Sequence, residues 1–221
     1  MILKCWFIVV LTFAGPCACR ATLVTFSFTG ATGNETSFAP DSQPAGGSVS
    51  DMSRGSGLLA SASAGEFSAR NWTTGTTRDL NDYYTFTITP NSGNTMTLTR
   101  LELDETRSGT GIRHWAICSS LDSGTALATF DVPDDVNQRV NEGVDLGASF
   151  NGLSSAVTFY IYGYEAEMGT GTWHIDNVEL SGSLTAVPEP AASGAIAGVW
   201  LLALCGWRVW RQRRCGEKLK F

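Results

Sequence analysis

The stretch YYTFTIT at residues 83–89 decides the fold, because apolar and polar residues alternate along it. Successive side chains of a β-strand point to opposite faces of a sheet, so this period of two predicts a strand with one buried face. Pro90 ends the run, and the turn residues NSGN follow at 91–94. The next stretch, MTLTRLEL at residues 96–103, alternates again, which predicts a second strand directly after the turn.

The same pattern recurs up to residue 191, with no sustained period of 3.6 that would indicate a helix. We therefore predict an all-β chain folded as a two-sheet, jelly-roll-like β-sandwich. A barrel also fits the spacing, but the long irregular connections favour the sandwich. Residues 29–78 are less regular, and residues 55–69 fit either an edge strand or a long loop. Further strands are expected at residues 22–28, 114–119, 126–130, 144–146, 157–164 and 172–180.

Charge is distributed unevenly between the body of the chain and its ends. Residues 22–187 hold 19 Asp and Glu against 7 Arg and no Lys, a formal net charge of 7 − 19 = −12, whereas the whole chain carries −6. A body this acidic repels nucleic acid and anionic lipid headgroups, so we expect no nucleic-acid partner. The acidity suits calcium binding or simple solubility outside the cell.

Cys118 is the one cysteine of residues 22–187, so we expect no disulfide within the body. It lies in the run WAIC at residues 115–118, where it fits a small hydrophobic core residue. The chain has two histidines, His114 and His174, and a catalytic thiol would need one of them as its base. We do not expect a Cys–His nucleophile.

Acidic residues are numerous, but their spacing selects no catalytic pair of the kind that glycoside hydrolysis needs. No glycine-rich phosphate loop precedes a helix, and the sequence has no histidine-rich metal cluster. We therefore expect no enzymatic activity, with a glycan-active enzyme that uses loop carboxylates as the alternative. The acids considered for that alternative are Asp104, Glu105, Asp122, Asp134, Asp135 and Glu165.

Three tyrosines alternate along one expected strand. Tyr160, Tyr162 and Tyr164 fall on one face of it, opposite Phe159 and Ile161. Aromatic rings stack on the CH groups of pyranose sugars, so this row fits a ligand platform. The row also fits a core or half-buried sheet face, which is the interpretation we favour. The sequence alone does not identify the ligand-binding residues.

The N-terminal residues have the layout of a secretory signal peptide. Lys4 gives a positive start, CWFIVVLTFA at residues 5–14 is an almost uninterrupted apolar run, and a helix-breaking Gly-Pro pair and small residues follow. We expect residues 1–21 to be removed. A lipoprotein acylated at Cys17 or Cys19 is the alternative.

The C-terminal end combines three segments with different physical properties. Val187-Pro188-Glu189-Pro190 holds two prolines, which fix φ and lack amide donors, so the chain there stays extended and open to a partner's backbone. Residues 191–207 are apolar and fit a short transmembrane helix, with a buried helix of a soluble domain as the alternative. The basic residues that follow stay on the cytoplasmic side of a membrane. They are Arg208, Arg211, Arg213 and Arg214.

This tail, residues 187–215, resembles the PEP-CTERM sorting signal of exported bacterial proteins. The resemblance implies a partner, the membrane protease called exosortase, which reads such tails and releases or transfers the protein. It also implies that the C-terminal helix holds the protein briefly in the inner membrane, before the protein serves at the cell surface or outside the cell. A permanently membrane-anchored surface protein without processing is the alternative.

A second resemblance covers residues 80–182. The blocks LTRLELD at 98–104, VTFYIYGY at 157–164 and GTWHIDNV at 171–178 resemble jelly-roll domains that often precede PEP-CTERM tails and are similar to carbohydrate-binding modules. The resemblance implies one sandwich domain over residues 22–186, with its last strand beside the first. It further implies an exported, non-catalytic surface or extracellular-matrix protein that binds glycan, with extracellular polysaccharide as the partner.

The same resemblance raises the question of a structural calcium ion. In carbohydrate-binding jelly rolls an acid near the last strand often holds such an ion, and Asp176 matches by position and residue type. Calcium prefers hard oxygen ligands such as carboxylates. The alternative is that Asp176 only accepts hydrogen bonds from backbone amides where the strands cross.

Overall fold

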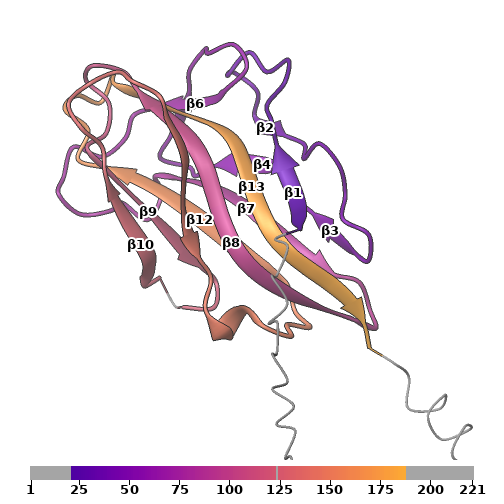
Figure 1. Cartoon of the computed structure of the whole chain (residues 1–221). Coiled ribbons are helices and arrows are strands. Elements are labelled where there is room, and N and C mark those ends of the chain that lie inside the picture. The colour runs from indigo at the N-terminus through magenta and orange to yellow at the C-terminus, as the bar shows by residue number, and fades with distance from the viewer. Residues whose placement is uncertain (1–20, 123, 188–221) are drawn as a thin grey trace, which may run out of the picture.

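Two antiparallel β-sheets pack face to face in the computed structural model, which describes residues 21–122 and 124–187 (Figure 1). These residues contain no α-helix, and their one helical turn is the 3₁₀ turn η1 at Ala148–Phe150. The predicted all-β sandwich is therefore confirmed.

The first sheet consists of the six strands β1 (Thr22–Phe26), β5 (Leu59–Ala60), β6 (Phe67–Arg70), β8 (Asn94–Arg107), β11 (Arg139–Asp145) and β13 (Thr172–Ala186). Their order is β11-β8-β13-β6-β5, and β1 also pairs with β13. The two long strands β8 and β13 pair from Trp173↔Arg107 to Ala186↔Asn94. The strand predicted at residues 96–103 therefore extends further in both directions, because β13 supplies backbone partners along the whole length.

The second sheet consists of the seven strands β2 (Ser37–Phe38), β3 (Gly47–Val49), β4 (Met52–Arg54), β7 (Tyr83–Pro90), β9 (His114–Ser119), β10 (Ala126–Asp131) and β12 (Val157–Tyr164). Their order is β10-β9-β12-β7-β4-β2, and β3 also pairs with β7. Strand β12 lies between β7 and β9, with Phe159 opposite Phe86 on one side and Ser119 on the other.

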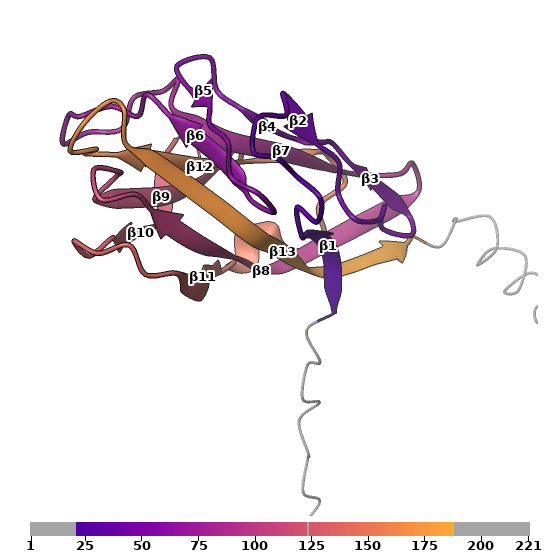
Figure 2. The same cartoon turned by 90° about the horizontal axis from the view of Figure 1, so that it is seen from above.

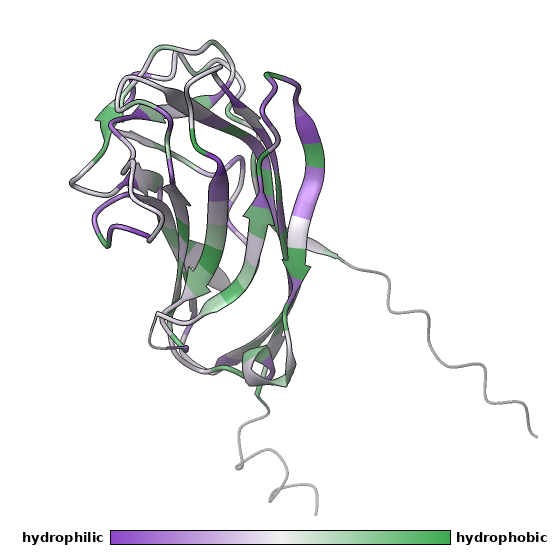
Figure 3. Ribbon diagram, turned by 90° about the vertical axis from the view of Figure 1, so that its left-hand side faces the viewer, coloured by the Kyte–Doolittle hydropathy of each residue, from purple (hydrophilic) through white to green (hydrophobic). Residues whose placement is uncertain are grey.

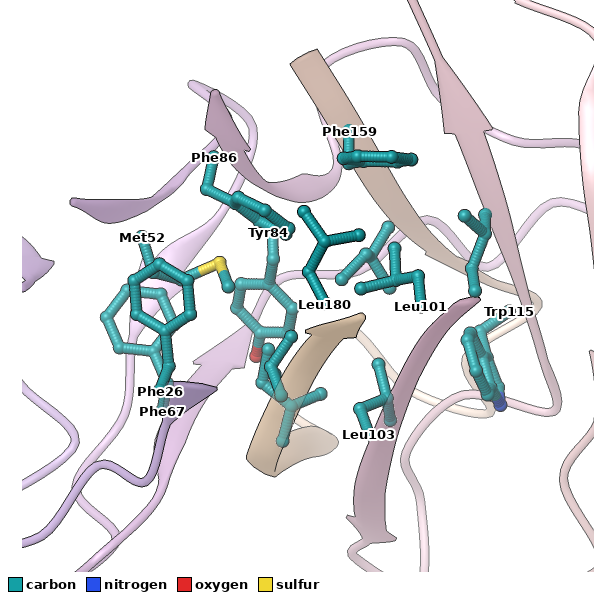
Figure 4. Packing of buried hydrophobic residues seen from close by; sticks show 14 of the residues in the cluster. Phe26, Met52, Phe67, Tyr84, Phe86, Leu101, Leu103, Trp115, Phe159 and Leu180 are labelled. Atoms are coloured by element: carbon teal, nitrogen blue, oxygen red, sulfur yellow. The ribbon is translucent and has the colours of Figure 1, made fainter. Parts of the chain in front are cut away.

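Alternate side chains of both sheets form the core (Figure 4). Strand β7 contributes Tyr84, Phe86 and Ile88, and β12 contributes Phe159 and Ile161, all at most 1% exposed. Hydrophobic and hydrophilic residues accordingly alternate along the strands in Figure 3. Burying one such side chain contributes roughly 1.5–3 kcal/mol to the stability of the fold. The apolar residues that recur at every second position therefore hold the two sheets together.

The irregular region at residues 29–78 contains five short strands, β2 to β6, the longest of four residues. Both alternatives for residues 55–69 are partly right, because β5 is an edge strand and loops surround it. These strands carry few large apolar residues. Their positions therefore depend on pairing with longer strands, such as β7 and β13.

The last strand lies beside the first, as the jelly-roll resemblance implies. Strand β1 pairs antiparallel with β13, with Phe26 opposite Val178, and Figures 1 and 2 both place the two strands side by side. The expected signal peptide except Ala21, the apolar stretch at 191–207 and the arginine cluster lie outside the described residues. Within the described part of the chain, no helix is long and apolar enough to cross a membrane.

Candidate functional site

The outer surface of the second sheet carries a cluster of tyrosines. Because Phe159 and Ile161 point into the core, the alternate residues Tyr160, Tyr162 and Tyr164 point away from it. Tyr83 of β7 lies directly opposite Tyr162 and joins the same outer surface. We call the surface formed by Tyr83, Tyr160, Tyr162 and Tyr164 the tyrosine face.

The rings of the tyrosine face contact one another. Tyr83 meets Tyr160 edge-on, with ring centroids 5.2 Å apart, and Tyr162 at 5.5 Å, while Tyr160 and Tyr162 stack at 6.1 Å. Tyr162 is 7% exposed, and Tyr83, Tyr160 and Tyr164 are half-buried. The row is therefore a half-buried sheet face, which is the interpretation that we favoured. Tyr83, Tyr160 and Tyr164 are still partly exposed to solvent.

Arg78 covers Tyr162 in the middle of the tyrosine face. This residue belongs to the loop at residues 71–82 that joins β6 to β7, and its guanidinium lies 5.3 Å from the ring centroid of Tyr162. The guanidinium also donates to the carbonyl oxygen of Gly124 at 3.1 Å and to the sulfur of Cys118. Beside it lies a pocket of about 340 Å³, lined by Thr76, Thr77, Arg78, Leu80 and Tyr164.

Cys118 is buried, as predicted, but it is not part of the core cluster. It lies opposite Tyr160 on the tyrosine face, under Arg78. The prediction of a small buried hydrophobic residue is therefore confirmed, but alternation in β9 sends Trp115 and Ile117 between the sheets and Cys118 to the opposite face. Burial raises the pKa of the Cys118 thiol, and the Arg78 guanidinium only partly offsets that, so the thiol stays protonated at neutral pH.

Neither histidine is bonded to Cys118. His114 lies between two carboxylates, with Nδ1 2.9 Å from Asp131 and Nε2 3.0 Å from Glu165, and its ring stacks on Tyr164. His174 belongs to the first sheet and bonds Thr172 through Nε2 at 2.8 Å. A thiol without a base nearby is a poor nucleophile.

A second pocket lies on another side of the loop at residues 71–82. Its volume is about 420 Å³, within the range of small-ligand sites. Asp82 lines it and is 5% exposed. Burial raises the pKa of the Asp82 carboxyl, and the nearby Asp79 carboxylate raises it further, although the backbone N–H of Thr73 has the opposite effect. The lining residues are Gly57, Asn71, Trp72, Thr73, Thr74, Asp79, Asn81, Asp82 and Gly169.

Asp176 lies on β13, away from both pockets. Its Oδ1 accepts the backbone N–H of Asn177 at 2.8 Å, which is the bonding expected under the alternative to a calcium ligand. Burial raises the pKa of Asp176, and the carboxylates of Asp104, Glu66 and Asp41 raise it too. In the described residues no group of three or more His, Cys, Asp or Glu side chains is arranged to hold a metal ion.

The six acids considered for catalysis are bonded internally, and Glu105 and Asp135 share the guanidinium of Arg139. Glu105 pairs with Arg139, Asp134 with Arg107 and Arg113, and Asp135 with Arg139. Asp104 accepts from the backbone N–H of Asn141, Asp122 from the hydroxyl of Ser119, and Glu165 contacts His114. None of the six lines either pocket described above.

Of the sorting motif, the structure describes only Val187. Its N–H donates to the carbonyl oxygen of Gly93 at 2.7 Å, directly after the end of β13, and its side chain is exposed. Pro188, Glu189 and Pro190 lie outside the described residues, as do Arg208, Arg211, Arg213 and Arg214.

Strand alternation predicts the positions of the tyrosines, but not those of Arg78, Asp79 and Asp82. These three belong to the irregular loop between β6 and β7, where no periodicity indicates which side chains converge. The one available signal was the density of polar residues directly before the clearest strand of the chain.

Comparison with known proteins leaves the family of the chain open. No protein-family model and no curated protein sequence matches it. Among solved structures, it is similar to the K2 cleaved adhesin domain of Lys-gingipain, at 15% sequence identity over 71% of this chain and 97% of that one. The TM-score of this likeness is 0.35, too low to support any argument about function.

Proposed function

We propose that the chain is an exported, non-catalytic surface protein that binds glycan through the tyrosine face. One observation carries the proposal: Tyr83, Tyr160 and Tyr162 form a mutually contacting aromatic cluster on the outside of the sandwich. Solvent-facing strand positions more often hold polar side chains, so a cluster of rings there favours a binding surface.

The chemistry of this surface suits a sugar. Pyranose rings present CH groups that stack on aromatic faces, and their hydroxyls need hydrogen-bond donors and acceptors. Arg78 supplies donors beside the rings, and the hydroxyls of Thr76 and Thr77 line the adjoining pocket. The jelly-roll resemblance of residues 80–182 to carbohydrate-binding modules supports the same ligand class.

Glycan-array binding of the full chain in detergent tests this proposal. We expect Tyr160→Ala and Arg78→Ala to weaken binding about tenfold or more, which corresponds to about 1.4 kcal/mol. Tyr160→Phe keeps the ring and should retain most of the affinity. Val140→Ala is the matched control, because Val140 is 58% exposed on β11 of the other sheet.

Two results would overturn the glycan site: no glycan bound by the wild type, or unchanged binding by Tyr160→Ala at an unchanged melting temperature. Release of reducing sugar from a bound glycan would instead favour the glycan-active enzyme. We place that alternative second, because the acids named for it are already bonded to basic, backbone or hydroxyl groups and none of them lines either pocket.

The sorting tail supports the placement of this activity at the cell surface. We expect exosortase to act at or near Pro188-Glu189-Pro190, after a C-terminal helix has held the chain in the inner membrane. Val187 is the last described residue and already lies at the surface, so cleavage beyond it would leave the sandwich intact. Mass spectrometry of the mature protein from its native host tests this step. Recovery of Lys220 and Phe221 on the surface-located form would favour the permanently anchored protein.

A further inference from the structure

We propose that His114 makes glycan binding at the tyrosine face depend on pH, with tighter binding in mildly acidic solution. This inference rests on the proposed function and adds its regulation. His114 is the first residue of β9, and it lies opposite Tyr164 of β12 on one side and Asp131 of β10 on the other. Its ring stacks on Tyr164, with the ring centroids 5.5 Å apart. A change of charge at His114 therefore takes place in contact with the tyrosine face.

Both ring nitrogens of His114 contact carboxylates. Nδ1 lies 2.9 Å from Oδ1 of Asp131, and Nε2 lies 3.0 Å from Oε2 of Glu165. A neutral imidazole has one N–H, so one of its nitrogens would face a carboxylate oxygen with a lone pair. The imidazolium has two N–H groups and can donate to both carboxylates. We call His114, Asp131 and Glu165 the histidine cluster, and its geometry fits the charged form of the ring.

The basic side chains near the histidine cluster have other partners. Arg113, the preceding residue in the chain, pairs with Asp134 at 3.0 Å and with Glu167 at 3.1 Å. The guanidinium of Arg78 lies over the ring of Tyr162. Among the described residues, the imidazolium is therefore the only cation within ion-pair distance of the two carboxylates of the cluster.

Three other titratable groups of this surface stay protonated between pH 5 and 8. Burial raises the pKa of the Tyr162 and Tyr164 phenols, and burial also raises the pKa of the Cys118 thiol. Histidine, in contrast, changes its charge within this range of pH. A pH dependence of binding in this range that disappears when His114 is replaced is therefore assigned to the histidine cluster.

Glu165 connects the histidine cluster to the loop that lines the adjoining pocket. Its backbone has a φ of +55°, a strained conformation for a residue other than glycine. Its N–H donates to the carbonyl oxygen of Gly75 at 3.0 Å, directly before Thr76 and Thr77. These two threonines line the pocket of about 340 Å³ together with Tyr164. The ion pair with the imidazolium helps to hold this strained residue, and so it helps to keep the pocket in shape.

Loss of the proton from His114 should weaken glycan binding. The imidazolium contacts both carboxylates, whereas the neutral ring can donate to Asp131 or to Glu165 but not to both. The pocket and the stacked ring of Tyr164 are then held less firmly. The side chains of the cluster are partly exposed, so each ion pair contributes little and the effect on affinity should be moderate.

The experiment measures the affinity of the full chain in detergent at about pH 5.5 and about pH 8. The probe is the uncharged oligosaccharide with the strongest signal on the glycan array, so that the probe itself does not titrate. The wild type should bind about two- to fivefold more tightly at the lower pH. His114→Gln cannot become charged and should bind equally at both. His174→Gln is the matched control, because His174 lies on β13 of the other sheet, and it should keep the wild-type dependence.

Equal affinity of the wild type at the two pH values would overturn the proposal, as would a pH dependence that survives His114→Gln. Absence of glycan binding at every pH would overturn the proposed function, and this regulation with it. The two failures are therefore distinguishable.

A nuclear magnetic resonance titration tests the histidine cluster without any glycan. The chain has two histidines, so comparison with His114→Gln assigns the imidazole signals. The amide signal of Glu165 should shift together with the imidazole signals of His114 between pH 5 and 8, and it should stay nearly constant in His114→Gln. A Glu165 amide that does not follow the histidine would show that the charge of His114 does not reach the loop, and it would overturn the proposal.

Discussion

Glu105 illustrates how single residues of this chain combine burial with charge. Its side chain is fully buried, its Oε2 accepts the indole N–H of Trp173 at 2.7 Å, and its Oε1 pairs with Arg139 at 2.8 Å. Burial raises the pKa of Glu105, while Trp173 and Arg139 act in the opposite direction. Strand β11 is therefore joined to the centre of the first sheet by a charge pair that must stay intact.

Removing the cation from this pair should be strongly destabilising. We expect Arg139→Met to lower the free energy of unfolding by about 3 kcal/mol, because it leaves a buried carboxylate without its partner. Urea denaturation measures the loss. The double variant Glu105→Gln with Arg139→Met should recover much of it, since the glutamine oxygen still accepts from Trp173. Equal losses in the single and double variants would mean that packing, not charge, is the cause.

Asp176 should make stability depend on pH in a predictable direction. Its folded-state pKa is raised above the ordinary value of 3.8, so its favourable contribution is complete below that value and is lost as the pH rises through the folded pKa. Without divalent cations, Asp176→Asn should therefore melt higher than the wild type at neutral pH, and the difference should shrink towards pH 4.

Melting curves from pH 4 to 8 in chelator check this expectation. A variant that melts lower than the wild type across that range would contradict it. If calcium at Asp176, as the sequence suggested, is the true arrangement, the order of the two proteins should reverse once calcium is added.

The bounds of a strand can be predicted from the sequence where one face of the strand is apolar and the other is polar. Residues 83–89, 114–119 and 157–164 were predicted within one residue, because large apolar side chains occupy every second position. The strand expected at 144–146 begins at Arg139 instead, since its outer half carries polar residues and depends on pairing with β8. The candidate site was predicted only in part. Alternation along the strand predicts the tyrosines. The positions of Arg78, Asp79 and Asp82 depend on the path of the loop at residues 71–82, which no local sequence pattern predicts.

The pairing of β8 with β13 depends on a close backbone approach at Gly182. An added Cβ there would lie 2.2 Å from the carbonyl oxygen of Thr97, next to a shift in register between Ser181 and Gly182. We expect Gly182→Ala to destabilise the fold by about 1–3 kcal/mol, because the two central strands must move apart. Ser183→Ala, at an exposed neighbouring position, is the control for urea denaturation. Equal stability of both variants would contradict the close approach.

The edge strands of both sheets decide whether two copies of the molecule can pair with each other. Of the four edge strands, β2 and β5 have two residues each, β11 carries Arg139, Glu142 and Asp145, and β10 ends at the charged Asp131. Short or charged edges resist pairing with a second copy. The formal charge of −12 on residues 22–187 adds long-range repulsion between bodies, so the sandwich favours a monomer.

We therefore expect residues 22–187 to fold alone as a soluble monomer with a β-type circular dichroism spectrum. The described core lies entirely within this range, and β1 and β13 close the first sheet without help from either end of the chain. Circular dichroism with size-exclusion chromatography tests this, and the full chain in detergent is the control for melting temperature. A strongly helical spectrum, or cooperative unfolding only when the terminal segments are present, would show that the sandwich needs more than its own two sheets. Added salt should raise the melting temperature modestly, because it screens repulsion among the carboxylates that folding brings together.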